Sequence, residues 1–505
     1  MRILCIRIIA MVALICVLAS CNFSFDFGNG DSNGKTSLAK KGSVDQTGLK
    51  VNPNSVVGYV GDPMPFYEDG VMNVYYLQDG RNTWLGFHPF ALMTTSDLVS
   101  YHDYGEVIPY VDSIYSEDLA LGTGSIIKGK DGYYHCFYTG WNGNKSSGLP
   151  YYEKIQHAVS TDKISWTKIP EHGFYGGHND FRDPYVYYDE TDDIYYMLVT
   201  TRVNDCGVIK QFKSKDLVTW TDNGVFFKND AGTYNMECPA FIYYNGYYYL
   251  TYNEQGSHRV THYRYKKNLS DPWIRPALDY FDGEGLYAGR VEKGFDSLFI
   301  YGWCGTKAGD FDQAEFDWAG SLVTLELIQQ ADGTLTPSMP KQYKETFNTQ
   351  VSYRTLSGKL VEKFDFDRNE QKSVAMEKLS SNITRMSFKL KAKGLLGECG
   401  LSFNSRVDDV LGTLNISFDL ENGKVRYYNN VFSFEDYGSP QITVPFEFEV
   451  NKEVDVDVII DDQIITVYVG GKIALTTRMI DMVGQNFSFY GNKAEASFSE
   501  VKFYE

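Results

Sequence analysis

The sequence has little cysteine, and its arrangement suits neither a metal site nor a disulfide framework. After Cys21 the cysteines are few, odd in number and widely spaced, at Cys136, Cys206, Cys238, Cys304 and Cys399. No CxxC pair and no Cys/His cluster occurs. We therefore expect these side chains to be buried as small apolar groups, with no bound metal.

Positive charge is also scarce. The chain carries 47 Lys and Arg against 65 Asp and Glu, a net charge of −18. A protein this acidic repels nucleic acids and anionic lipid surfaces, so a neutral substrate is the expected partner. The sequence also lacks a glycine-rich loop that would cradle phosphates, and we expect chemistry without a cofactor.

Long apolar runs are missing except at the N-terminus. Residues 1–20 carry two arginines and then IIAMVALICVLA, which is typical of a secretory signal peptide and short for a membrane span. The following Leu18-Ala19-Ser20-Cys21 resembles a bacterial lipobox, in which the chain is cut before the cysteine and the thiol is acylated. A plain secretory signal is the alternative.

These features predict a bacterial cell-envelope protein that reaches the membrane through its lipid anchor alone. The anchor would lie in the outer membrane, on its cell-surface or its periplasmic face. Residues 21–50 are rich in Gly, Ser, Asp and Lys. We expect them to form a flexible tether behind the lipidated Cys21.

Aromatic residues are abundant, at 15% of the chain, and Tyr is the commonest of them. Tyr and Phe favour strands, and Tyr presents both an apolar face and a hydroxyl. A chain of 505 residues also exceeds one ordinary core. The composition therefore predicts an all-β protein of two or three domains with aromatic-lined clefts.

An internal repeat occupies the first two thirds of the chain. Five strand-like runs recur at steps of 50 to 62 residues: GVMNVYYLQ from Gly70, GYYHCFYTG from Gly132, DIYYMLVTT from Asp193, GYYYLTYNE from Gly246 and DSLFIYGWC from Asp296. A second motif with the same period lies between them, as SDLVSY, STDKISW and SKDLVTW. An all-β unit of this size matches one four-stranded blade. The repeat predicts a five-bladed β-propeller over residues 51–342.

Three acids fall at one place in this repeat. Asp62, Asp183 and Glu237 lie shortly before three of the runs, and each has a proline one or two residues later. Equivalent points of a propeller surround its axis, so the three carboxylates are expected to meet. Repulsion would drive their pKa values apart, which suits glycoside cleavage by one protonated and one ionised carboxyl. The alternative is that Asp-Pro is merely a common turn dipeptide.

Several motifs in order resemble glycoside hydrolase family 32, which includes invertases, inulinases and levanases. They are GTGS from Gly122, HNDFRDP from His178, MECP from Met236, GLYA from Gly285 and the C-terminal VDVIIDDQIITVYVGGKIALTTRM from Val456. The resemblance covers about residues 55–505. It implies a catalytic propeller followed by a β-sandwich.

The resemblance also implies a retaining, two-step hydrolysis of fructosides or fructans such as sucrose, inulin or levan. Asp62 would be the nucleophile and Glu237 the general acid, then the general base. Asp183 would hold sugar hydroxyls and stabilise the oxocarbenium-like transition state. Five further residues match substrate-binding positions, with ordinary blade packing as the alternative for the aromatic ones: Arg182, Trp84, Thr123, Tyr287 and Trp303.

The first motif departs from the family. It reads Gly61-Asp62-Pro63-Met64-Pro65, where the family usually has Asn-Asp-Pro-Asn-Gly. Both asparagines that help to shape a fructose pocket are absent. Two alternatives therefore stay open: an inverting furanosidase or xylosidase of the related family 43 type, and a non-catalytic glycan-binding surface lipoprotein.

From about Thr346 the repeat gives way to strict alternation of polar and apolar residues. Examples are SFKLK from Ser387, NISFD from Asn415 and EFEV from Glu447. Alternation of this kind indicates strands with one buried face. We expect a two-sheet β-sandwich over residues 346–505 that braces the propeller, with glycan contact as a weaker alternative.

Overall fold

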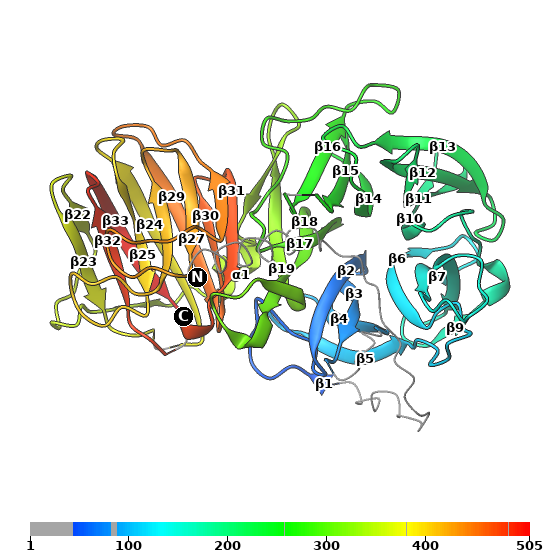
Figure 1. The fold of residues 1–505 in the computed structure, drawn as a ribbon, viewed down its shortest axis with the longest axis horizontal. Coiled ribbons are helices and arrows are strands. Elements are labelled where there is room, and N and C mark those ends of the chain that lie inside the picture. Colours follow the sequence, from blue (N-terminus) through cyan, green and yellow to red (C-terminus); the bar gives the residue numbers. More distant parts are fainter. Residues whose placement is uncertain (1–43, 82–87, 257, 380, 483) are drawn as a thin grey trace, which may run out of the picture.

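The computed structural model describes residues 44–81, 88–256, 258–379, 381–482 and 484–505. The predicted signal peptide, Cys21 and Trp84 lie outside these ranges. Within them the secondary structure is almost wholly β, and the single α-helix, α1, spans Lys341–Thr346. Figure 1 shows two bodies side by side: a ring of small sheets, coloured blue to light green, and a pair of layered sheets, coloured olive to red.

The ring consists of five antiparallel sheets, or blades. Blade 1 is formed by β2 (Tyr59–Glu68), β3 (Val71–Asp79), β4 (Phe90–Thr95) and β5 (His102–Ile108). Blade 2 is formed by β6 (Ala120–Lys128), β7 (Tyr134–Trp141), β8 (Glu153–Ser160) and β9 (Trp166–Lys168). Blade 3 is formed by β10 (Arg182–Asp189), β11 (Ile194–Val203), β12 (Cys206–Ser214) and β13 (Thr221–Lys228).

Blades 4 and 5 complete the ring. Blade 4 is formed by β14 (Met236–Tyr244), β15 (Tyr247–Glu254) and β16 (Thr261–Lys266), with isolated bridges in place of a fourth strand. Blade 5 is formed by β17 (Tyr287–Gly294), β18 (Ser297–Lys307), β19 (Phe316–Gln329) and β20 (Leu335–Ser338). The first strands β2, β6, β10, β14 and β17 contact one another all the way round. A bridge between Val60 and Gly320 joins blades 1 and 5.

The second repeated motif forms one kind of turn. In blade 3 the Ser214 hydroxyl accepts from the backbone N–H of Leu217, and Asp216 accepts from the next two amides. The same turn connects the third strand to the fourth in blades 1 and 2, at residues 95–100 and 160–165. The side chains bond backbone groups that the strands leave unpaired. The second repeated motif therefore recurs because three blades use the same turn between their outer strands.

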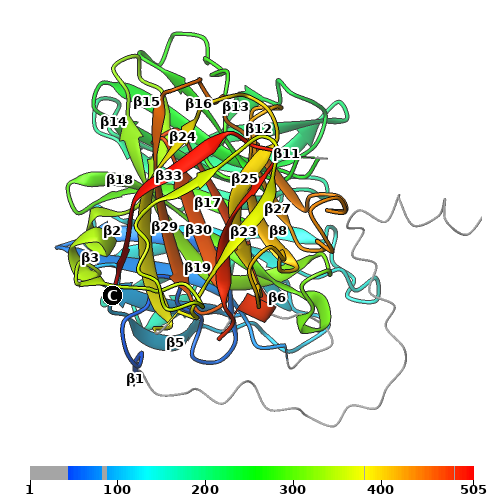
Figure 2. The ribbon, with the colours of Figure 1, turned by 90° about the vertical axis from the view of Figure 1, so that its left-hand side faces the viewer.

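The sandwich follows α1 and has two sheets around one apolar core. The first sheet contains β21 (Gln350–Val351), β22 (Phe364–Phe366), β24 (Ile383–Ala392), β29 (Glu453–Asp461), β30 (Ile464–Val469), β31 (Ile473–Arg478) and β33 (Ala496–Tyr504). The second contains β23 (Gln371–Met376), β25 (Glu398–Phe403), β26 (Leu414–Asp419), β27 (Lys424–Tyr428), β28 (Ile442–Pro445) and β32 (Phe487–Asn492). Figure 2 shows the sandwich in front of the propeller. The described part of the chain also contains three 3₁₀ turns, at Pro170–His172, Ala308–Asp310 and Ile480–Met482.

Strand β31 attaches the sandwich to blade 5. The Arg478 guanidinium donates to the Gly305 carbonyl at 2.8 Å and to the Ser321 hydroxyl at 2.9 Å. Buried Asp282 accepts from the Thr476 backbone N–H at 2.8 Å and from its hydroxyl at 2.6 Å. These bonds satisfy polar groups that the contact would otherwise bury unpaired. The contact therefore holds the two domains in a defined geometry.

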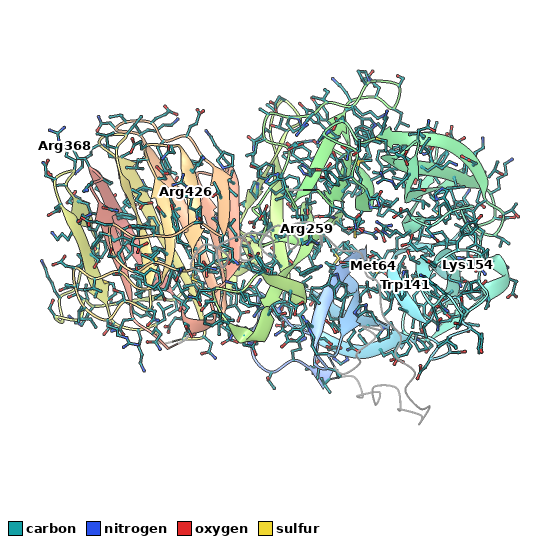
Figure 3. All side chains as sticks on the ribbon, in the orientation of Figure 1. Met64, Trp141, Lys154, Arg259, Arg368 and Arg426 are labelled. Atoms are coloured by element: carbon teal, nitrogen blue, oxygen red, sulfur yellow. The ribbon has the colours of Figure 1, made fainter. Side chains whose placement is uncertain are left out.

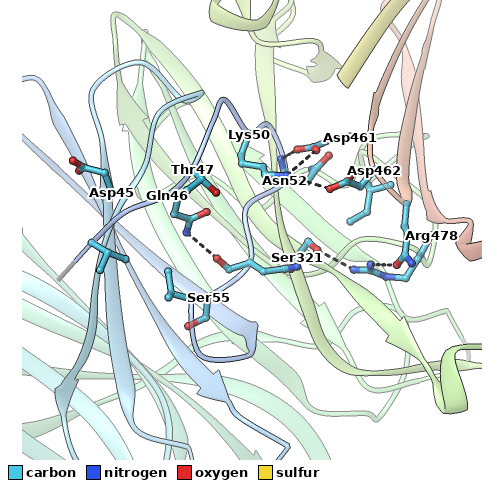
Figure 4. Close-up of a pocket in the computed structure, with 15 residues that line it drawn as sticks. Asp45, Gln46, Thr47, Lys50, Asn52, Ser55, Ser321, Asp461, Asp462 and Arg478 are labelled. Atoms are coloured by element: carbon cyan, nitrogen blue, oxygen red, sulfur yellow. Dashed lines mark hydrogen bonds and ion pairs between the residues drawn. The ribbon is translucent and has the colours of Figure 1, made fainter. Parts of the chain in front are cut away.

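The chain that precedes blade 1 is part of the fold from residue 44. β1 (Val44–Asp45) pairs with β5, and Asp461 accepts from the backbone N–H groups of Val51 and Asn52. Lys50 contacts Asp462 at 3.1 Å, and these residues border a cavity of about 580 Å³ between the domains (Figure 4). The sequence assigned residues 44–50 to the tether. They instead lie along blade 1 and the sandwich, because their backbone groups find partners there.

Candidate active site

Each first strand of the ring carries a β-bulge in its pairing with the second strand of the same blade. In each blade the pairing between the first and second strands shifts register once. The shifts lie between Gly61 and Met64, Gly122 and Gly124, Arg182 and Tyr185, Glu237 and Ala240, and Tyr287 and Arg290. A bulge re-aims side chains and ends regular pairing, and bulges are common beside active sites. Here they turn side chains of five strands toward one site.

The bulges correct one detail of the sequence prediction. Pro63, Pro184 and Pro239 occupy the same place in three bulges, and the residue before each has positive φ. That residue is an aspartate in the first two bulges but Cys238 in the third. Glu237 is therefore one residue out of phase with the aspartates, and its structural equivalent is the arginine at 182. The prediction that all three acids share one repeat position is wrong for Glu237, because the proline marks the register.

Asp62 is held by two neutral donors. The Thr123 hydroxyl donates to Oδ2 at 2.7 Å, and the indole Nε1 of Trp303 donates to Oδ1 at 3.1 Å. Burial raises the pKa of Asp62, these two hydrogen bonds oppose the rise, and the nearby charge of Glu237 adds to it. Each carboxylate oxygen is oriented by one bond and keeps a lone pair.

Glu237 is held by residues at the equivalent place in the two adjacent blades. Arg182 of blade 3 donates to Oε1 from Nε at 3.2 Å and from Nη2 at 2.9 Å. Tyr287 of blade 5 donates its hydroxyl to Oε2 at 2.9 Å. Gln255, just after β15, adds a bond of 2.6 Å to Oε1. The side chain is thereby fixed in one position.

Asp183 is the most buried of the three carboxylates, with 4% of its surface exposed. Its Oδ2 accepts from the Cys238 backbone N–H at 2.9 Å, and its own N–H donates to the Thr139 hydroxyl at 2.8 Å. Burial raises its pKa to about 7; Arg182 opposes that rise, and the charges of Glu237 and Asp62 add to it. The three acids thus interact electrostatically, as the sequence predicted for one shared site.

Family models match both domains of the chain. The model for the glycosyl hydrolases family 32 N-terminal domain matches residues 53–335, and that for the family 32 C-terminal domain matches residues 342–505. The chain belongs to glycosyl hydrolase family 32. It is therefore a glycosidase, as predicted, and the family 43 and non-catalytic alternatives are not favoured.

Individual proteins resemble the chain over most of its length. It is 24% identical to a sucrose-6-phosphate hydrolase of Pediococcus pentosaceus over 456 residues, which covers 85% of this chain and 84% of the relative. Identity to the sucrose-6-phosphate hydrolase of Vibrio alginolyticus is 22%, with the same coverage.

Solved structures show the same architecture. The β-fructofuranosidase of Aspergillus kawachii matches with a TM-score of 0.69 at 18% identity, and that of Bombyx mori with 0.66 at 18%; each match covers 90% of this chain and 93% of the other. The predicted fold, a five-bladed propeller followed by a β-sandwich, is confirmed.

The altered first motif of this family 32 member has a structural explanation. A Cβ added at Gly61 would lie 2.3 Å from Cη2 of Trp318, so a larger residue there would have to displace the indole. Trp318 packs on Trp303 with ring centroids 6.0 Å apart and on His88 with centroids 4.3 Å apart. At the second altered position, the Gly124 N–H donates to the Met64 sulfur at 3.1 Å. An indole thus packs against position 61, and a thioether accepts a hydrogen bond at position 64.

The structure brings seven of the eight predicted site residues together. Arg182, Thr123, Tyr287 and Trp303 each donate to Asp62 or Glu237, so these aromatic residues do more than pack within blades. Trp84, the eighth, lies outside the described residues.

Three further residues of the site were missed in the sequence. Asp180 accepts from Arg182 at 2.9 Å, and the Phe181 N–H donates to Glu153 at 2.5 Å. Gln255 is the third. Asp180 lies inside the HNDFRDP motif and could have been found there. Nothing in the sequence marks Glu153 or Gln255, because Glu153 begins an ordinary strand and Gln255 follows one.

Among the described residues no group of three or more His, Cys, Asp or Glu could hold a metal ion.

Proposed function

We propose that the protein hydrolyses β-fructofuranosidic bonds with retention of configuration, with Asp62 as nucleophile and Glu237 as acid and base. The observation that carries this proposal is a pair of oriented carboxylates, close enough for the charge of Glu237 to raise the pKa of Asp62. Asp62 keeps one lone pair on each oxygen beyond its Thr123 and Trp303 bonds, while Glu237 is oriented by Arg182 and Tyr287. Relatives and structural neighbours named as fructofuranosidases support the choice of sugar.

The reaction follows from these positions. In the first step an oxygen of Asp62 bonds to the anomeric carbon, the bond from that carbon to the leaving oxygen breaks, and Glu237 transfers its proton to that oxygen. In the second step Glu237 removes a proton from water, whose oxygen attacks the same carbon and releases Asp62. Two inversions give net retention.

Asp183 has a supporting role in this scheme. Burial raises the pKa of Asp183 to about 7, and the charges of Glu237 and Asp62 add to that rise. Sugar hydroxyls that donate to Asp183 would stabilise its ionised form.

The deciding experiment measures sugars released from sucrose, inulin and levan by the mature chain, beside Asp62→Asn and Glu237→Gln. Both substitutions preserve side-chain shape, and each is expected to lower kcat/KM by at least about a thousandfold because one step loses its reacting group. Asp222→Asn, on the exposed outer strand β13, is the matched control. NMR of the first product formed should show the retained anomer. No release from any of the three substrates would refute the proposal.

We also propose that the protein is exported and lipid-anchored through Cys21 to the outer membrane. The support is the sequence pattern of residues 1–21. In the described part of the chain, the structure has no helix both long and apolar enough to cross a membrane. In a bacterial host, Cys21→Ser should abolish palmitate labelling and release the protein from the membrane fraction, whereas Cys16→Ser should do neither. Labelled Cys21→Ser protein would contradict the anchor.

A further inference from the structure

The outer face of the second sandwich sheet is unusually polar for a buried surface. Along β25, β26 and β32 one residue in two enters the apolar core, and the alternate ones point away from it. The outward residues form cross-strand rows, among them Asn492–Glu398–Asp419 and Ser488–Ser402–Asn415. A solvated sheet would expose such residues. Here Ser402, Asn415 and Ser488 are fully buried.

Two loops cover this polar face. Leu411 and Val431 come from the loops after β25 and β27 and pack on Tyr428 and Tyr490 of the sheet, with Phe434 against them. The loops do not pair every polar atom that they bury. Three such atoms have no hydrogen-bond partner among the described residues: Asn415 Oδ1, Ser488 Oγ and Arg426 Nε. Buried polar atoms without partners are costly and call for a specific cause such as bound water; of these three residues, Arg426 also lines the cavity described below.

A cavity of about 880 Å³ opens at the edge of this face. The residues that could recognise a ligand there are Glu398, Asp419, Glu421, Arg426, Tyr428 and Tyr437. Arg426 forms an ion pair with Asp419, the Ser417 hydroxyl orients Glu398 at 2.5 Å, and the Tyr428 and Tyr437 rings meet edge to face. The groups are therefore held in place before any ligand arrives.

This set of groups suits a neutral polyol. Each sugar hydroxyl can donate to a carboxylate and accept from a guanidinium or a phenol, and tyrosine rings offer apolar faces for sugar carbons. The cavity is lined by Glu398, Asp419, Glu421 and Glu435 against Arg368, Arg426 and Lys493. The slight excess of negative charge, in an acidic chain, disfavours an anionic ligand.

We propose that this cavity, here called the sandwich pocket, binds a neutral saccharide unit of the polymeric substrate. It is separate from the catalytic carboxylates: Figure 3 shows Arg426 and Arg368 on the sandwich, apart from Arg259, which lies over the Tyr287 ring in the propeller. The identity of the sugar rests on the proposed fructoside hydrolysis. A second site on the same chain raises the local concentration of polymer without altering the reaction of a short substrate.

The test measures binding of levan and inulin to full-length mature protein made inactive by Glu237→Gln. Glu398→Gln and Tyr437→Phe are introduced singly and together. Both keep side-chain shape and leave the Arg426–Asp419 ion pair intact, so folding should survive. Loss of a hydrogen bond to a charged group should weaken polymer binding about tenfold or more. Asp455→Asn, exposed on β29 of the opposite sheet, is the matched control.

In the active enzyme the same pocket substitutions should raise KM for levan or inulin and leave kcat/KM for sucrose unchanged. Fructan binding that is equal in the pocket variants and the control would overturn the proposal, as would absence of polymer binding in the parent. If the polymers bind through the pocket but neither they nor sucrose are hydrolysed by the active form, the proposed function fails while the saccharide site stands.

Discussion

Asp62 and Asp183 occupy the same position in two bulges, but their carboxylates accept different hydrogen bonds. Asp62 receives one side-chain hydrogen bond on each oxygen, from Thr123 and Trp303. Asp183 receives a backbone N–H on Oδ2, and no described residue donates to its Oδ1. In the proposed mechanism the first arrangement would orient a carboxylate for attack, and the second would leave an acceptor for a sugar hydroxyl. One local fold thus supports two roles.

Removing the Thr123 hydroxyl should shift the pH profile. That hydroxyl stabilises ionised Asp62 and lowers its pKa against the rise caused by burial. Thr123→Val therefore raises this pKa further, so the acid limb of kcat/KM, where activity falls as Asp62 is protonated, should move to higher pH by about one unit. Thr123→Ser keeps the donor and should leave the limb in place. An unshifted limb in Thr123→Val would contradict the assignment of Asp62.

Restoring the family's asparagine at position 61 should damage this protein. The new side chain would meet the Trp318 ring, whose Cη2 lies 2.3 Å from the position of a Cβ. We expect Gly61→Asn to destabilise the fold by about 1–3 kcal/mol and to raise KM, because the indole must move. Adding Trp318→Ala should recover the stability lost through overcrowding, which urea unfolding would measure. Equal stability of wild type and Gly61→Asn would contradict this packing.

At the scale of a blade, the sequence motifs can be compared with the strands and bulges that they form. Strand positions followed from aromatic runs, because alternation and turn residues are local properties. The bulges did not follow from them, since a shift of pairing register depends on the neighbouring strand. For that reason the acids were predicted to converge, but the offset of Glu237 from Asp183 was not. The fourth strand of blade 4 was likewise overestimated from the regularity of the repeat.

The turn of blade 2 gives a test at this scale. Asp162 accepts from two backbone amides and the Ser160 hydroxyl, and despite partial burial these bonds hold its pKa at about 2, below the usual 3.8. Because the pKa is lower in the folded state, its contribution to stability is present above about pH 4 and is lost as the pH falls through 2. Asp162→Ala should cost about 1 kcal/mol at pH 7.

Urea unfolding of wild type and Asp162→Ala at pH 7 and pH 3 would check this, with the difference smaller at pH 3. Asp162→Asn retains an acceptor oxygen and should lose less. A cost that does not change with pH would show that the charge of Asp162 adds nothing to the turn.

At the scale of the whole molecule, the sandwich and the propeller share buried polar contacts. Arg478 of β31 donates to blade 5, and the chain before blade 1 bonds Asp461 of β29. The N-terminal segment, the propeller and the sandwich therefore meet at one junction (Figure 4). Unfolding of one domain exposes the contact surface of the other, which favours a shared transition.

Arg478→Met should weaken that coupling. The substitution removes the donors to Gly305 and Ser321 and leaves their acceptors buried, at a cost of about 2–4 kcal/mol. The thermal transition should fall and separate into two, and limited proteolysis should release a fragment of the sandwich. Lys472→Met, exposed in the adjacent turn, is the control. A single transition at the wild-type temperature in Arg478→Met would show that the apolar contact alone joins the domains.

By itself the sequence determined that the protein is all-β, that five repeats form one domain, and that Asp62, Asp183 and Glu237 belong to one site. These features depend on periodicity and on spacing along one chain, which sequence records directly. Only the tertiary structure decided which donors orient each carboxylate, why Gly61 is small, and that the sandwich encloses a polar pocket. Those features arise between strands distant in sequence, where packing and hydrogen bonding, not local preference, choose the neighbours.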